Sequence, residues 1–205
     1  MASSEKSTGK VLSPSKLAHV VLRTNKFDQM RAFYKTFLGA DEIFANEMMA
    51  FLSYDDEHHR IAIIQVPGVR DKDYDTCGLE HIAFTFDSLK DLCTAYKQRK
   101  AVGIEPGWCT NHGPTTSMYY RDPDGNQLET QVDNFADPEK ATAMMAGDLY
   151  RENFLGSDFD PEELCLNVEG GADEEKLKVR KEVGPRGGES LPAILASIRS
   201  APVGA

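Results

Sequence analysis

Short apolar runs, each followed by apolar residues at helical spacing, occur twice along the chain. Residues 17–23 and 79–86 are rich in apolar and β-branched side chains, which is typical of short strands. Residues 27–37 and 89–96 then carry apolar side chains three and four positions apart, which predicts one helix after each strand. Further strands are predicted at 42–45, 48–54 and 60–66 after the first helix, and at 104–109, 116–121 and 126–132 after the second.

The two units also resemble each other residue by residue, at the constant offset that separates His19 from His81. Like residues at this offset are Leu17 and Leu79, Leu22 and Phe84, Phe27 and Leu89, Met30 and Leu92, Tyr34 and Tyr96, and Lys35 and Lys97. Such a match indicates two copies of one β-α-β-β-β unit, over about 16–67 and 78–133. One unit alone would expose a face of its sheet, so we expect an α+β fold in which paired units form a curved mixed sheet around a cavity.

The rest of the chain does not take part in the repeat. Residues 1–15 are polar and predict a loose leader, which leaves one domain over 16–135. The composition changes at about residue 136, and residues 136–205 predict an extension of short helices and irregular segments. We expect this extension on the surface of the domain or in a dimer contact.

Composition and charge exclude several classes of partner. The chain has 205 residues, with 23 Lys and Arg against 33 Asp and Glu, and its formal net charge is −10. A chain this acidic is repelled by phosphate backbones, so nucleic acid is not expected as a partner. No apolar run approaches the roughly 20 residues of a membrane span, and the first residues lack the apolar stretch of a secretory signal. We therefore expect a cytoplasmic protein whose four cysteines, which form no CxxC pair, are reduced.

Three residues form a candidate metal site. His19 and His81 stand at the same place on the first strand of each unit, so pairing of the units would bring them together. Glu129, in the last strand of the second unit, adds a carboxylate, and two imidazoles with one carboxylate suit Fe(II) with open positions for other ligands. Alignment of the hairpins places Ala62 opposite Glu129, and alanine cannot supply a fourth ligand.

The segment from Thr110 to Glu129 carries a resemblance to a known family. It reads TNHGPTTSMYYRDPDGNQLE. In its His-to-Tyr, Asp-Pro, Gly and Glu spacings it is similar to the signature of the type I extradiol ring-cleaving catechol dioxygenases. Residues 17–132 as a whole resemble the vicinal oxygen chelate superfamily, to which those enzymes belong.

The resemblance implies a set of site residues. His19, His81 and Glu129 match the positions that bind ferrous iron in the family. His112 and Tyr119 match the residues that hydrogen-bond the substrate oxygens, and even spacing from Glu129 favours Tyr119 over its neighbour Tyr120. The acid–base histidine of the family corresponds to His59, with His58 as the alternative.

The resulting hypothesis is an Fe(II)-dependent extradiol dioxygenase. It would insert both atoms of O₂ next to the vicinal hydroxyls of a small aromatic diol, and Mn(II) is an alternative metal. A homodimer is expected, because small two-unit domains need a partner to cover their sheet edges. Two other functions stay open: a glyoxalase-like isomerase or transferase, and a metal-free module that binds an aromatic ligand.

Overall fold

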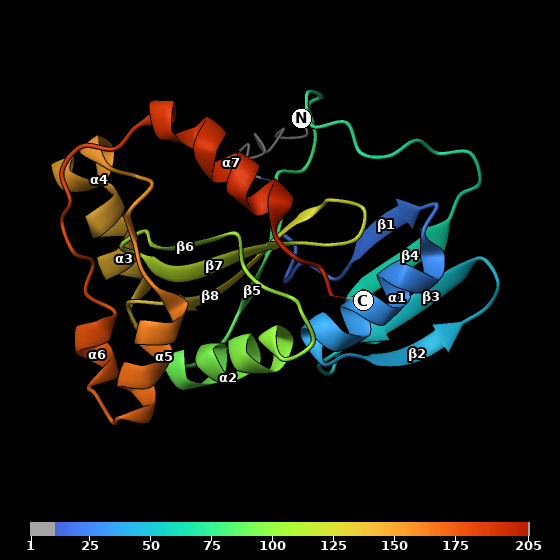
Figure 1. The fold of residues 1–205 in the computed structure, drawn as a ribbon, viewed down its shortest axis with the longest axis horizontal. Helices are drawn as coiled ribbons and strands as arrows, with labels where there is room; N and C mark the ends of the chain where they lie inside the picture. Colours follow the sequence, from blue (N-terminus) through green and yellow to red (C-terminus); the bar gives the residue numbers. More distant parts are fainter. Residues whose placement is uncertain (1–10, 205) are drawn as a thin grey trace, which may run out of the picture.

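Each repeat unit folds into a β-sheet of its own, with one helix packed against it (Figure 1). The structure is a computed structural model that describes residues 11–204. The first unit comprises β1 (Val20–Thr24), α1 (Phe27–Leu38), β2 (Asp41–Ala45), β3 (Met49–Ser53) and β4 (Ile61–Gln65). The second comprises β5 (His81–Thr85), α2 (Leu89–Lys100), β6 (Trp108–Asn111), β7 (Thr115–Arg121) and β8 (Gln127–Asp133). The repeated β-α-β-β-β order predicted from the sequence is therefore confirmed.

The two sheets have the same topology. Their strand orders are β1-β4-β3-β2 and β5-β8-β7-β6-β9, where β9 (Ser157–Asp158) is a short strand that follows the second unit. In each sheet the first strand pairs in parallel with the last strand of its unit. Val21 pairs with Ala62 in the first sheet, and Ala83 pairs with Glu129 in the second. Ala62 thus occupies the place of Glu129, as the hairpin alignment predicts.

Two details of the predicted fold are wrong. The units do not join into one curved sheet; the strands of residues 11–204 form separate sheets of four and five strands. The strand predicted over 104–109 begins only at Trp108, because Pro106 has no N–H to donate to a neighbouring strand. Ile104 makes an isolated bridge to Val203 instead.

The units are joined through their helix-covered faces. The Phe37 ring of α1 contacts the rings of Phe84 and Tyr120, with centroids 6.3 and 5.2 Å away. Tyr34 on the same helix is fully buried, and its hydroxyl donates to the Asp122 carboxylate at 3.0 Å. Arg99 at the end of α2 donates to the Phe37 carbonyl. One core therefore lies between the two sheets and includes side chains of both units.

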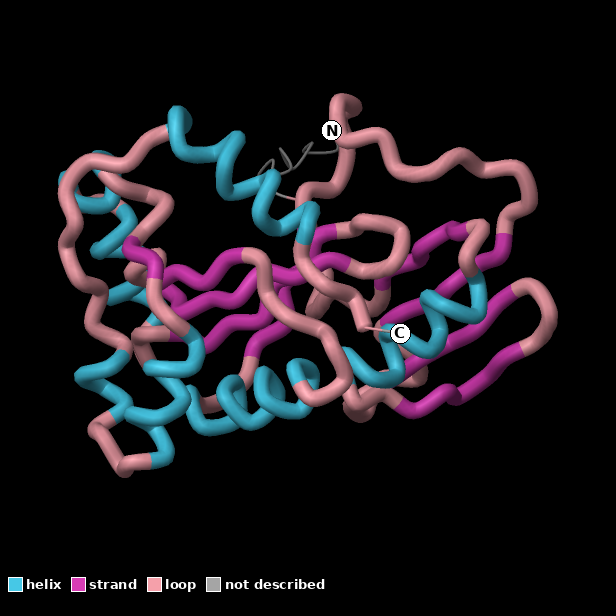
Figure 2. The backbone as a smooth tube through the Cα atoms, in the orientation of Figure 1, coloured by secondary structure: helices cyan, strands magenta, loops and turns pink. Residues whose placement is uncertain are grey.

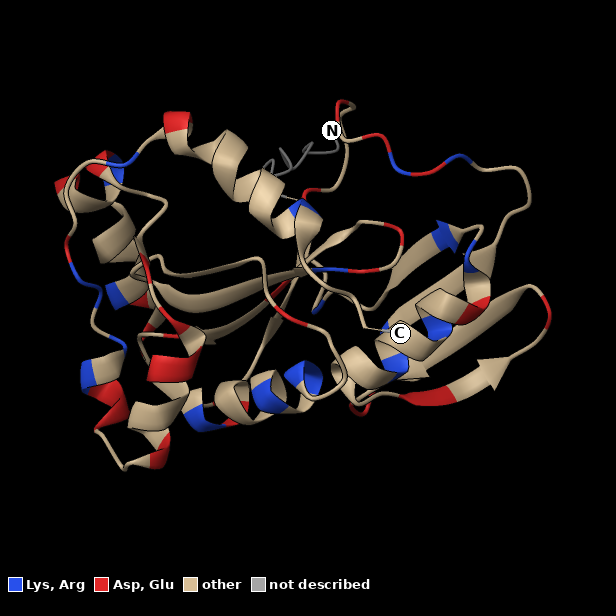
Figure 3. Ribbon diagram, in the orientation of Figure 1, with Lys and Arg blue, Asp and Glu red and all other residues tan. Residues whose placement is uncertain are grey.

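The C-terminal extension wraps the second sheet (Figure 2). It comprises α3 (Pro138–Met145), α4 (Asp148–Glu152), β9 (Ser157–Asp158), α5 (Pro161–Glu169), α6 (Glu174–Leu177), a 3₁₀ turn (Gly188–Ser190) and α7 (Leu191–Ser200). Strand β9 pairs with β6, so the extension is part of the sheet rather than a surface appendage. Helix α5 packs on α2, where basic side chains of α2 form ion pairs with acidic ones of α5 (Figure 3).

The remaining predictions concern the chain ends and the membrane. Residues 1–10 of the predicted leader lie outside the described residues, and residues 11–15 contain no helix or strand. Within residues 11–204, none of the helices has the length and apolar character that a membrane crossing requires.

Candidate active site

His81 and Glu129 form the centre of the site. His81 begins β5, Glu129 lies in the adjacent strand β8, and the parallel pairing of the two strands brings their side chains together. The Nε2 atom of His81 lies 3.0 Å from a carboxylate oxygen of Glu129. The Glu129 side chain is 6% exposed and that of His81 is 36% exposed, so the carboxylate lies at the floor of the site and the imidazole lies at its opening.

Tyr119 and His112 extend the site along the sheet. Tyr119 in β7 pairs directly with Glu129, whereas its neighbour Tyr120 faces the core and is fully buried. The alternation of side chains along the strand therefore selects Tyr119, as the even spacing from Glu129 predicts. The Tyr119 hydroxyl lies 2.8 Å from Nε2 of His112, and Nδ1 of His112 lies 3.2 Å from the Phe154 carbonyl.

The electrostatics of these four residues follow from their burial and their contacts. Burial opposes ionisation of Glu129, but hydrogen bonds from His81 and Ser117 outweigh it and hold the pKa of Glu129 below its usual value. The hydrogen bond to Glu129 raises the pKa of His81 in turn. Burial lowers the pKa of His112 and raises that of Tyr119. The site therefore holds an ionised carboxylate beside a neutral His112 and a protonated Tyr119.

The same four side chains lie in one pocket of about 370 Å³. Its floor comes from the second sheet, and its other side comes from the extension, including Phe154, Leu155, Leu191, Ile194 and Leu195. Trp108 also lines it and stacks on the Tyr119 ring, with centroids 4.8 Å apart. Trp108 is not among the site residues predicted from the sequence; the alternation of side chains along β6 was the available signal, because Trp108 pairs with Tyr119. No pattern in the sequence indicated that residues of the C-terminal extension would line this pocket.

His19 does not join this pocket. All the residues that line it lie in 80–198, so the first unit contributes nothing to it. Within residues 11–204, no three His, Cys, Asp or Glu side chains come close enough together to hold a metal ion. The expectation that pairing of the units in one chain brings His19 to His81 and Glu129 is therefore wrong. The physical reason is that the units meet through their helix-covered faces, while these ligands lie on the opposite faces.

His19 belongs instead to a second cluster, on the first sheet. Its ring lies 4.3 Å from that of His59 and 6.5 Å from that of His58, between centroids. The His59 ring in turn stacks on Phe51 at 4.5 Å, and Phe51 holds the register position of Tyr119. Burial, followed by the neighbouring His19 and His58, lowers the pKa of His59. His19, directly before β1, and His81, at the start of β5, thus belong to two separate clusters, one on each sheet. We call these clusters half-sites: the first contains His19, His58 and His59, and the second contains His81, Glu129, His112 and Tyr119.

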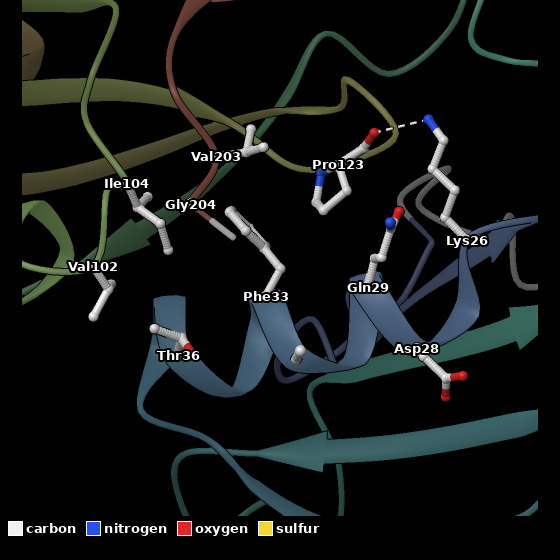
Figure 4. A pocket seen from close by; sticks show the side chains of 11 residues that line it. Lys26, Asp28, Gln29, Phe33, Thr36, Val102, Ile104, Pro123, Val203 and Gly204 are labelled. Carbon is white, nitrogen blue, oxygen red and sulfur yellow. Dashed lines mark hydrogen bonds between the residues drawn. The ribbon is translucent and has the colours of Figure 1, made fainter.

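A larger cavity lies elsewhere and is not a site of this kind. It has a volume of about 700 Å³ and lies between α1 and the end of the chain, where Phe33 faces Val203 (Figure 4). Lys26 at its edge donates to the Pro123 carbonyl at 3.0 Å. It has no histidine or cysteine in its lining, and its one carboxylate, Asp28, points away from it.

Comparison with known proteins agrees with this architecture. Residues 16–130 match the model of the glyoxalase/bleomycin resistance protein/dioxygenase superfamily. The chain belongs to this superfamily. A solved glyoxylase/bleomycin resistance protein/dioxygenase domain from Frankia sp. EAN1pec shares the fold, with a TM-score of 0.50 and 21% identity over 59% of this chain and 99% of that chain.

Two curated proteins are more similar to this chain in sequence. Biphenyl-2,3-diol 1,2-dioxygenase 3 of Rhodococcus globerulus is 44% identical over 80% of this chain and 88% of its own length. Biphenyl-2,3-diol 1,2-dioxygenase 2 of the same organism is 45% identical over 71% of this chain and 77% of its own length. Because the superfamily domain ends near residue 130, the similarity at 80% coverage reaches beyond the family domain.

Proposed function

We propose that the chain is an extradiol dioxygenase that opens the ring of an aromatic diol beside its vicinal hydroxyls, with both atoms of O₂ entering the product. The observation that carries the proposal is the convergence of His81, Glu129, His112 and Tyr119 in one pocket. The relatives named biphenyl-2,3-diol 1,2-dioxygenases support it.

The donor set suits Fe(II), with Mn(II) as the alternative. His81 and Glu129 offer one imidazole and one buried, ionised carboxylate, and His19 is the proposed third ligand. Within one chain this set is incomplete, because His19 lies on the other sheet. When bound, the metal supplies a centre at which both oxygens of a catechol and one dioxygen can bind.

The protein side chains around the ligands are suited to control protons. The neutral His112 and the protonated Tyr119 hydrogen-bond each other beside Glu129, so each can also hydrogen-bond a substrate oxygen. We assign the acid–base role to His59, with His58 as the alternative. A histidine that is neutral near pH 7 can accept a hydroxyl proton and return it later.

Oxygen uptake tests the proposal. Protein reconstituted with Fe(II) without air, then given O₂ and biphenyl-2,3-diol or catechol, is expected to consume one O₂ per diol and to form a yellow ring-opened product. Metal-free protein is the control and is expected to consume none. Tight Fe(II) binding without oxygen uptake would favour an isomerase or transferase, and absence of metal binding would favour a ligand-binding module. Either result would overturn the proposal.

A further inference from the structure

Two segments of the C-terminal extension meet at His112. The first is the turn over 153–156, between α4 and β9, and the second is the stretch over 178–182, which follows α6. In the first, the Phe154 carbonyl lies 3.2 Å from Nδ1 of His112. In the second, Nη1 of Arg180 donates to the His112 carbonyl at 3.2 Å. The extension therefore contacts both the ring and the backbone of His112.

Arg180 also joins the two segments to each other. The same Nη1 atom donates to the Asn153 carbonyl at 2.8 Å. Nε and Nη2 donate to the two oxygens of the Glu182 carboxylate, at 3.1 and 2.9 Å. The Arg180 side chain is 2% exposed, so water does not compete for these hydrogen bonds. A planar guanidinium can serve several acceptors in a fixed geometry, and here it fixes the backbone before Phe154 relative to that of His112.

The turn that carries the Phe154 carbonyl is closely fitted to the sheet. Asn153 is 2% exposed, and its side chain accepts from the Gly156 N–H at 2.7 Å and donates to the Gly156 carbonyl at 3.1 Å. Gly156 has a φ of +82°, and a Cβ there would lie 2.1 Å from the Asn111 carbonyl oxygen. Because only glycine allows this approach, the turn is built against the strand that leads to His112.

The contact with Phe154 decides which ring nitrogen of His112 carries the hydrogen. A backbone carbonyl can only accept a hydrogen bond, so Nδ1 of the neutral ring is the protonated nitrogen. Nε2 then has a free lone pair and accepts from the Tyr119 hydroxyl, 2.8 Å away. The Tyr119 oxygen is left to accept a hydrogen bond from a diol hydroxyl. In the other tautomer Nε2 would be a donor, and the Tyr119 oxygen would be occupied as its acceptor.

We propose that Arg180 is a positioning residue of the active site. Through the carbonyls of Asn153 and His112, it keeps the His112 ring against the Phe154 carbonyl, in the tautomer that leaves the Tyr119 oxygen free for a diol hydroxyl. The C-terminal extension thereby sets the direction of the hydrogen bonds in a pocket whose floor belongs to the second sheet. This inference deepens the proposed function and rests on it for the role of the diol, whereas the tautomer itself depends on no reaction.

The ring nitrogens of His112 test the tautomer directly. Nitrogen-15 NMR of the whole chain without metal distinguishes a protonated ring nitrogen from an unprotonated one by its chemical shift. At pH 8 the ring is neutral, because burial lowers the pKa of His112 from its ordinary value. The chain has 5 histidines, and the signals of His112 are those missing from His112→Gln. We expect a protonated Nδ1 and an unprotonated Nε2; the reverse in the unaltered protein would overturn the inference.

Two variants test the role of Arg180. Arg180→Met removes the donors and keeps a side chain of similar length, so the Nε2-protonated tautomer of His112 is expected to become visible. In the Fe(II)-loaded variant, kcat for biphenyl-2,3-diol is expected to fall about tenfold, with a smaller rise in KM, because the other contacts of the diol are unchanged. Arg180→Lys keeps a charge and a donor and is expected to recover part of both losses.

Arg186→Met is the matched control. Arg186 also belongs to the extension, and its Nη1 atom donates to the Gly156 carbonyl at 3.3 Å and to the Asp158 carboxylate at 2.7 Å. It therefore holds the same turn, but none of its hydrogen bonds among residues 11–204 reaches His112. The tautomer is expected to be unchanged in this variant. An equal change in Arg186→Met and Arg180→Met would assign the effect to the turn as a whole and overturn the role of Arg180.

The two readouts separate this inference from the proposed function. If no diol consumes oxygen, the proposed function fails, while the tautomer and its dependence on Arg180 are still measured without metal. An unchanged tautomer in Arg180→Met, or in Arg180→Lys if the methionine variant does not fold, would overturn the role of Arg180. A changed tautomer with an unchanged kcat would support the contact and overturn its part in the reaction.

Discussion

Glu129→Ala is expected to lower kcat/KM for the diol by at least about 10³-fold and to remove the bound metal. Loss of a residue that only supports a ligand costs roughly 10- to 100-fold, and loss of the single carboxylate ligand is expected to exceed that. In this site the carboxylate would also offset the charge of a bound metal, and its counterpart in the first sheet, Ala62, cannot. Metal analysis and oxygen uptake on the same sample measure both effects.

The apoprotein of this variant is expected to fold as stably as the unaltered apoprotein, within about 1 kcal/mol. Glu129 is buried beside His81, and breaking a buried ion pair is costly when it leaves a charge behind. Here the remaining partner is a histidine, which can become neutral. Glu139→Ala, at an exposed position on α3, is the control. Metal bound at full occupancy by Glu129→Ala would contradict the assigned ligand set.

Arg99→Ala is expected to lower the free energy of unfolding by about 3 kcal/mol. Arg99 is 3% exposed, and its Nε and Nη2 atoms donate to the Phe37 carbonyl at 2.8 and 2.6 Å. That carbonyl belongs to the last turn of α1, where the helix offers no internal donor. The guanidinium also lies 4.0 Å from the centroid of the Phe37 ring. Alanine would leave a cavity and an unpaired carbonyl between the two units.

Denaturant unfolding of the unaltered protein and of three variants, Arg99→Ala, Arg99→Met and Arg70→Ala, tests this prediction. Arg99→Met fills most of the volume without a charge, and burial already lowers the pKa of Arg99, so methionine is expected to lose less stability than alanine does. Arg70→Ala is the control, because Arg70 is exposed. Equal stabilities for Arg99→Ala and Arg70→Ala would show that the Arg99 contact does not hold the units together.

The half-site on the second sheet could be read from the sequence because strand geometry is local. Side chains alternate across a strand, so even spacing places Tyr119 and Glu129 on one face and Tyr120 on the other. The repeat offset likewise predicts that Ala62 holds the position of Glu129, and the strand pairing confirms it. The first relation depends on spacing within one unit and the second on the correspondence between the two units, and both can be read from the sequence.

The position of the C-terminal extension could not be predicted from spacing in the sequence. Its helices could be expected from apolar spacing, since the apolar residues of α7 lie on one face. The surface against which that face packs depends on contacts between residues far apart in the chain. Trp108 illustrates the same limit, because core and pocket offer similar apolar surroundings to an aromatic ring.

By itself the sequence determined the repeated units, the strand positions of His19, His81 and Glu129, and the face on which each strand displays them. Only the tertiary structure decided that the units meet through their helices, which leaves His19 with His59 and separates it from Glu129. The physical reason is that hydrophobic burial is non-directional. The apolar faces of α1 and α2 could be buried in more than one pairing of the sheets, and the periodicity of the sequence is the same in each.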